Sequence, residues 1–181
     1  MGFRHAAVLS ATSFFLGVLF ISFNVDRRIL YGGVRPSEED YADAFKFYTT
    51  FFEAPLAIKA LLHAVMGIGL LALVGKLHKW DDSAVFFDGT SLALFLAGVI
   101  IYISVTIPTM RTVVVPLPDD SIGDQRDAIA VLAAGNTLIA GCLVGVLGLQ
   151  AGQEYARRAE IRERKNVEKK EAAAASEKKM Q

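Results

Sequence analysis

The chain has 181 residues, of which 53% are hydrophobic, and its acidic and basic side chains balance to a formal net charge of zero. A neutral chain lacks the basic footprint of a nucleic-acid-binding protein, so that class of partner is excluded. The apolar residues are gathered into long runs, which is typical of a membrane protein, because a helix needs roughly 20 apolar residues to cross a bilayer core.

Four runs of this length occur, and they predict an all-α polytopic membrane protein with four transmembrane helices in a compact bundle. The predicted spans are residues 6–25, 54–77, 89–110 and 128–152, so residues 1–153 form the transmembrane domain. A hydrophobic helical bundle in water is the alternative, but none of the runs has the periodicity of a helix with one polar face. The lipid bilayer is therefore the expected surroundings.

The first run is longer than the apolar part of a usual signal peptide, and no small-x-small cleavage site follows it. We expect a retained helix that also serves as the targeting signal. The connection behind it, residues 26–53, is the longest one in the chain, and Ser37 followed by Glu38 and Asp40 predicts a helix start there.

Aromatic side chains recur after that start at spacings of three and four, namely at Phe45, Tyr48, Phe51 and Phe52. This stripe indicates an interfacial helix on the lipid headgroups, or an aromatic belt that continues into the second span. Both interpretations remain open at this point.

Lys59 and His63 lie in the second apolar run, one helical turn apart. A charged group in hydrocarbon costs about 2.5–3.5 kcal/mol on insertion scales, so such residues can mark a proton or substrate pathway. The alternative is a lysine that snorkels and a histidine that bonds to a neighbouring helix. No intramembrane carboxylate is evident as a partner for Lys59, so we favour the structural interpretation.

The third run begins behind Asp88, whose carboxylate we expect to act as an N-cap. It must end before Pro116 and Pro118, because proline removes backbone donors. The connection of residues 111–127 contains both prolines.

The segment of residues 154–181 is rich in charged residues, with Glu154 and Glu160 each four positions before an arginine. It is predicted to be a solvated helix or a partly disordered segment. Its basic residues close behind the fourth span place both termini in the cytosol, although Arg27 and Arg28 behind the first span argue the other way.

Small residues occupy one face of three of the spans, and two of them form a GxxxG motif in the fourth. Small residues let helices approach closely, either within this bundle or against a partner, and an asparagine can hydrogen-bond across such an interface. The candidates for helix packing or client contact are Ser13, Gly17, Ala93, Ala97, Asn136, Gly141 and Gly145.

A catalytic constellation is not recognisable, since the sequence offers no plausible Ser/His/Asp set, no His and Cys cluster and no glycine-rich phosphate loop. We therefore expect neither an enzyme nor a bound cofactor or metal. The alternative function is a small tetraspan transporter or channel subunit with Lys59 and His63 in its pathway. An enzyme acting on lipid through His63 is a weaker alternative.

Five stretches of the sequence are distinctive in their order and spacing, namely Leu9–Val18, Phe86–Leu92, Asp124–Asp127, Val131–Thr137 and Val144–Ala156. Together they resemble the fungal family of endoplasmic-reticulum packaging chaperones for amino acid permeases, also called the SHR-three or secretory-component family. Gly135 stands where that family is expected to have a serine.

The resemblance implies four spans, residence in the endoplasmic reticulum and no catalytic residues. It further implies that the chain keeps nascent amino acid permeases from aggregating and promotes their packaging into COPII vesicles, whose coat components would meet the cytosolic tail. The connections 26–53 and 111–127 would then be lumenal. Separately, Lys178 and Lys179 resemble a dilysine retrieval signal, which acts as an address only at a free cytosolic end.

Overall fold

The computed structural model describes residues 2–33, 35–78 and 85–180. Within these ranges every regular element is helical. The segments that are long and apolar enough to cross a membrane are Phe3–Tyr31, Leu56–Leu77, Val85–Val114 and Ile122–Glu171. The predicted all-α polytopic fold with four transmembrane helices is confirmed.

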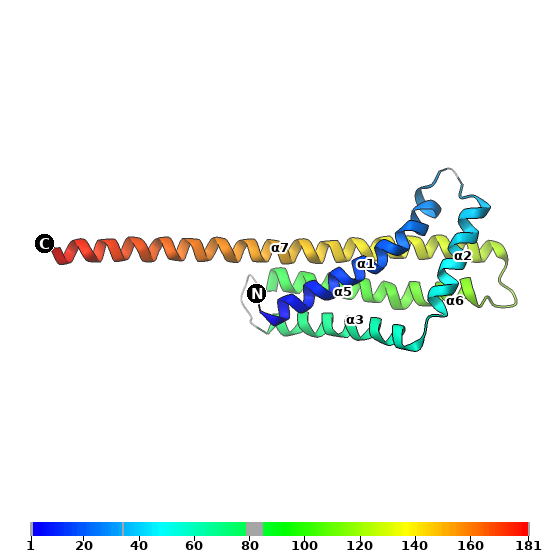
Figure 1. The fold of residues 1–181 in the computed structure, drawn as a ribbon, viewed down its shortest axis with the longest axis horizontal. Helices are drawn as coiled ribbons and strands as arrows, with labels where there is room; N and C mark the ends of the chain where they lie inside the picture. The colour runs from blue at the N-terminus through cyan, green and yellow to red at the C-terminus, as the bar shows by residue number, and fades with distance from the viewer. Residues whose placement is uncertain (1, 34, 79–84, 181) are drawn as a thin grey trace.

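The helices form a bundle in which α3, α5 and α7 run side by side, while α1 crosses them obliquely and α2 lies across one end (Figure 1). The most extensive contact joins α1 to α7; α5 also packs on α7, and α3 packs on α1. The elements are α1 (Phe3–Tyr31), α2 (Glu38–Phe52), α3 (Leu56–Leu77), the π-helical turn η1 (Val85–Gly89), α5 (Thr90–Ile101), the π-helical turn η2 (Tyr102–Thr106), α6 (Ile107–Val114) and α7 (Ile122–Met180).

Helix α1 is longer than its apolar run, because it continues through Asp26 to Tyr31. The expected loop of residues 26–53 therefore begins later than predicted. The physical reason is that the Asp26 side chain is buried and hydrogen-bonded, so its polarity does not end the helix. Beyond Tyr31, Gly33 has a φ of 137°, a left-handed conformation that glycine adopts without steric cost.

Helix α2 begins as the sequence predicts, with Ser37 as its N-cap. The backbone N–H of Asp40 donates to Ser37 Oγ at 3.2 Å, and the Ser37 N–H donates to the Asp40 carboxylate at 2.9 Å, which completes a capping box. Hydrogen bonding from the Ser37 hydroxyl holds the pKa of Asp40 below its usual range. The cap thus fixes the point at which the chain turns into α2.

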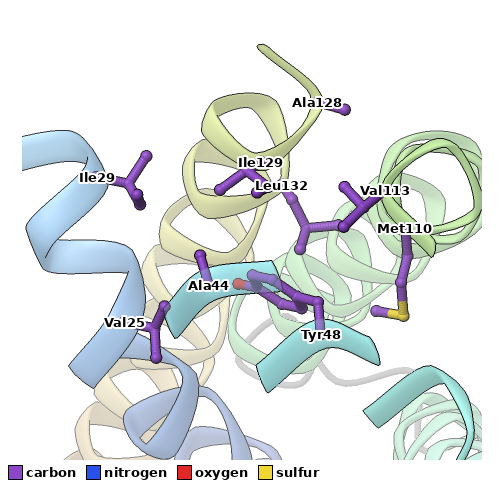
Figure 2. Close-up of a cluster of buried hydrophobic side chains, with 9 residues drawn as sticks. All are labelled: Val25, Ile29, Ala44, Tyr48, Met110, Val113, Ala128, Ile129 and Leu132. Atoms are coloured by element: carbon purple, nitrogen blue, oxygen red, sulfur yellow. The ribbon is translucent and has the colours of Figure 1, made fainter. Parts of the chain in front are cut away.

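The aromatic stripe of α2 faces the protein. Tyr48 is 2% exposed, and Figure 2 shows it with Ala44 among side chains of α1, α6 and α7. Phe45, Phe51 and Phe52 are half-buried against the same cluster. The stripe therefore docks α2 onto one end of the bundle, and neither free contact with headgroups nor an aromatic belt describes it fully.

The third membrane segment contains both π-helical turns, and its helix runs on to Val114 before Pro116. Asp88 was expected to cap the start of this helix. Instead it lies inside η1, is 2% exposed and makes no cap, because its carboxylate bonds to side chains of α3 and α7. The N-cap prediction for Asp88 is wrong for this reason.

Helix α7 is continuous over 59 residues and joins the fourth membrane segment to the charged segment without a break. Its second half projects beyond the bundle, where the side chains from Tyr155 to Glu171 are exposed (Figure 1). Pairs such as Arg158–Glu154 at 2.8 Å and Arg164–Glu160 at 2.7 Å lie along it. Of the two predicted alternatives for this segment, the structure shows the helix.

Candidate functional site

A buried polar cluster, the Asp26 cluster, joins α1, α2 and α7. It consists of Asp26, Tyr48 and Asn136, which are 1%, 2% and 8% exposed. Asn136 donates its amide N–H to Asp26 Oδ2 at 2.9 Å and lies 3.0 Å from the Tyr48 hydroxyl, which itself donates to Asp26 Oδ1. Burial raises the pKa of the Tyr48 hydroxyl well above its usual range, so this hydroxyl stays protonated as a donor.

The Asp26 cluster lies beside a groove of about 190 Å³ between α1 and α7, which we call the α1/α7 groove. Most of the groove is apolar, but Asp26, Asn136 and Thr137 contribute to its lining. The remaining lining residues are Leu16, Leu19, Phe20, Phe23 and Ala140. The groove therefore offers an apolar wall with a polar group at one position, a combination that suits an amphipathic side chain.

The predicted small-residue candidates divide into outward and inward positions. Ser13, Gly17, Ala93 and Gly141 are exposed, whereas Ala97 and Gly145 are half-buried. Among the described residues, a Cβ atom added at Gly17 or Gly141 would meet no atom within 4 Å beyond the neighbouring backbone of its own helix. Asn136, by contrast, bonds within the bundle. The exposed members therefore lie on the surface of the described bundle.

The two glycines of the GxxxG motif, Gly141 and Gly145, differ in their surroundings within the described chain. A Cβ at Gly145 would lie 2.9 Å from Leu94 Cδ1 of α5, whereas Gly141 faces outward. The two glycines are four residues apart, but the fourth span packs on α5 beside only one of them.

Gly145→Leu is expected to lower the free energy of unfolding by about 1–3 kcal/mol, because the added side chain overpacks the contact with Leu94. Gly141→Leu is the matched control and is expected to leave it unchanged to within about 0.5 kcal/mol. Unfolding of the purified protein in detergent micelles measures both values. Equal losses from the two variants would contradict the division into inward and outward positions.

A second buried polar cluster, the Lys76 cluster, lies toward the other end of the bundle and joins α3, η1, α5 and α7. Lys76 Nζ lies 2.7 Å from Asp88 Oδ1, and it donates to Gln150 and, at 2.8 Å, to Gln153 Oε1. Both glutamine amides donate back to Asp88, at 3.1 and 2.8 Å, and Gln150 also donates to Ser91 Oγ at 3.0 Å. Every charged group of this cluster is therefore paired.

Sequence reasoning missed the Lys76 cluster, although a signal was present. Gln150 and Gln153 are three residues apart near the end of an apolar run, so they share one helix face. Two amides on one face of a membrane helix indicate a polar partner on a neighbouring helix. The partner is Asp88, which the sequence analysis had assigned to a helix cap.

A central cavity of about 100 Å³ lies between α1, α2, α3, α5 and α7. Its lining includes His63, Tyr102 and Thr106, and the Thr106 hydroxyl is buried without a hydrogen-bond partner in the described part of the chain. The centre of the His63 ring lies 5.8 Å from that of the Tyr102 ring, so His63 contacts a neighbouring helix as expected. Its hydrogen bond, however, joins Nδ1 to the Lys59 carbonyl oxygen of its own helix at 2.7 Å. Lys59 Nζ lies 5.3 Å from the centre of the Phe52 ring at the α2 end of the bundle.

Two further expectations concern metals and the dilysine signal. Among residues 2–33, 35–78 and 85–180, no group of three or more His, Cys, Asp or Glu side chains is placed to hold a metal ion.

The backbone at Lys178 and Lys179 is helical, but their side chains lie outside the described residues. The dilysine expectation therefore stays a prediction.

Comparison with known proteins identifies the family. Residues 1–181 match the SHR3 chaperone family, described as ER membrane protein SH3. A relative in Schizosaccharomyces pombe, secretory component protein psh3, is 28% identical over 151 residues, which cover 82% of this chain and 67% of the relative. No solved structure matches. Both descriptions are of a chaperone or secretory component and not of an enzyme. With its four membrane-spanning helices, the chain is a multi-pass endoplasmic-reticulum membrane protein that belongs to the SHR3 chaperone family.

Proposed function

We propose that this protein is a membrane-localised chaperone for amino acid permeases. It would assist the folding of nascent permeases, prevent their aggregation and promote their packaging into COPII vesicles. Membership of the family over the whole chain supports the chaperone class. The permease clients and the vesicle coat are our extension, based on the resemblance of the residues described above.

The observation that carries this proposal is the exposure of small residues on the membrane segments. Ser13, Gly17, Ala93 and Gly141 are exposed, and in the described part of the chain no other helix lies within 4 Å of a Cβ added at either glycine. A partly inserted permease presents small faces and polar intramembrane groups that lack their final partners. Helix contacts of this kind contribute only about 0.6–2 kcal/mol each, so a client can be covered and later released without ATP.

We place both termini in the cytosol, with α2 on the lumenal side, because basic residues follow the fourth membrane segment. The exposed second half of α7 then projects into the cytosol, where coat components are available to it. Its side chains from Tyr155 to Glu171 are exposed and largely charged, which suits a polar protein surface as partner.

Deletion of the gene tests the proposal directly. Tagged amino acid permeases are expected to remain in the endoplasmic reticulum of the deletion strain, while an unrelated plasma-membrane protein reaches the cell surface. Fluorescence microscopy and fractionation measure the distribution of each. Arrival of the permeases at the plasma membrane in the deletion strain would refute the permease assignment.

The double variant Lys59→Ala with His63→Ala is expected to keep most of the permease-export activity. Both side chains contact aromatic rings of the bundle, and we assign them structural roles. Complementation of the deletion strain measures the activity, with the amount of each protein determined in parallel. Loss of export at normal protein levels would instead favour a transport pathway through these residues.

A further inference from the structure

Among the described residues, the two most buried carboxylates differ in their partners. Asp26 is 1% exposed and Asp88 is 2% exposed. Asp88 is paired with the Lys76 ammonium at 2.7 Å. In the part of the chain that the structure describes, Asp26 makes no ion pair. A buried carboxylate is ordinarily either paired with a cation or neutral, so Asp26, unlike Asp88, has a place for a cation from outside the chain.

Both carboxylate oxygens of Asp26 are placed to accept hydrogen bonds. Oδ1 accepts from the Tyr48 hydroxyl, and Oδ2 accepts from the Asn136 amide at 2.9 Å. Both oxygens therefore act as acceptors, which is the arrangement that an ionised group requires. Both donors are neutral, so they orient the carboxylate but would not compensate a negative charge on it.

Asp26 lines the α1/α7 groove, whose volume of about 190 Å³ is large enough for a side chain. For comparison, a cavity of roughly 150 Å³ holds a benzene molecule. The groove presents Phe20 and Phe23 from α1 and Ala140 from α7. Apolar walls that lead to a carboxylate match a lysine or arginine side chain, which has an apolar stem and a cationic end.

We propose that the α1/α7 groove binds a basic side chain on a transmembrane helix of the client, with the cation paired to Asp26. This inference rests on the proposed chaperone function for its choice of partner. A lysine or arginine in an unfinished membrane domain has no counter-ion yet, so it is expensive to leave exposed to lipid. Asp26 supplies the missing charge until the client packs.

A synthetic transmembrane peptide tests the proposal without a known client. The probe is a polyleucine helix with a single lysine near one end, in phosphatidylcholine vesicles that contain the full chain. The control peptides carry leucine or glutamine at that position. A photoreactive residue is placed at Thr137, which lines the groove, or at Leu71, which is 74% exposed on α3.

From position 137, the lysine peptide is expected to crosslink at concentrations at least about tenfold lower than either control peptide. Asp26→Asn should remove this preference. Equal crosslinking of the lysine and leucine peptides would overturn the proposal, as would equal crosslinking from positions 71 and 137. A glutamine peptide that matches the lysine peptide would overturn the choice of a cation.

A second variant keeps the test decisive if Asp26→Asn fails to fold. Ala140→Leu narrows the groove and leaves the Asp26 cluster in place, because Ala140 lines the groove without bonding to the cluster. It is expected to lose the preference for the lysine peptide. Retention of the full preference by a folded Ala140→Leu protein would overturn the proposal.

The outcomes for the groove and for the chaperone function are separable. Permease export that depends on the protein, together with no lysine preference, would overturn the groove alone. Permease export that does not depend on the protein would overturn the proposed function, whatever the peptide binds.

Discussion

Lys76→Met is expected to lower the free energy of unfolding by about 3–5 kcal/mol, because it leaves the buried carboxylate of Asp88 without its cation. The Lys76 and Asp88 side chains are only 12% and 3% exposed, so water cannot replace the lost ion pair. The glutamine amides of the cluster also lose an ammonium that donates to both of them. Unfolding in detergent micelles measures the loss.

The matched control is Lys46→Met, which makes the same change on the exposed surface of α2 and is expected to alter stability by no more than about 0.5 kcal/mol. Combining Lys76→Met with Asp88→Leu should recover part of the stability, since no charge is then left buried. Equal stabilities of Lys76→Met and Lys46→Met would mean that the ion pair contributes nothing.

Asn136→Ala is expected to lower the free energy of unfolding by about 1–3 kcal/mol, because it leaves the buried Asp26 carboxylate without one of its hydrogen bonds. The change also loosens α2, since the Tyr48 hydroxyl loses its contact with the amide. Hydrogen exchange of α2 amides should therefore become faster in this variant. Exchange in α3, which supplies no residue to the Asp26 cluster, should stay close to that of the parent.

Asn24→Ala is the control for this change, because the Asn24 amide is exposed and bonds only to carbonyl groups of its own helix. It is expected to leave both the stability and the exchange of α2 unchanged. If Asn24→Ala and Asn136→Ala behave alike, the Asp26 cluster does not hold α2 in place.

The membrane segments could be predicted because an apolar run of sufficient length is a local property of the sequence. The start of α2 at Ser37 was equally local, since the capping box spans four adjacent positions. The spacing of the aromatic residues in α2 predicts a helix, but it does not indicate which surface those side chains pack against. Which surface it covers depends on α6 and α7, whose buried residues Met110 and Leu132 lie far along the chain.

The buried polar clusters could not be predicted in the same way. Asp26 and Asn136 are 110 residues apart, and Asp88 and Gln150 are 62 apart, so no local pattern joins them. Each carboxylate stands at an end of an apolar run, where solvent exposure is the simplest expectation. Similarly, the difference between Gly141 and Gly145 depends on the position of Leu94 in another helix.

Because α7 is one continuous helix, its projecting half cannot rotate independently of the half that lies in the membrane domain. At 1.5 Å per residue, its 59 residues extend about 90 Å. Asn136 and Gln150 fix the rotation of this rod about its own axis through the two polar clusters. The contacts within the membrane domain therefore also fix the direction, around the helix axis, in which each charged side chain of residues 155–171 points. A protein that docks on this segment therefore meets its charged side chains in one fixed orientation. Their distance from the membrane domain is fixed by the rise of the helix.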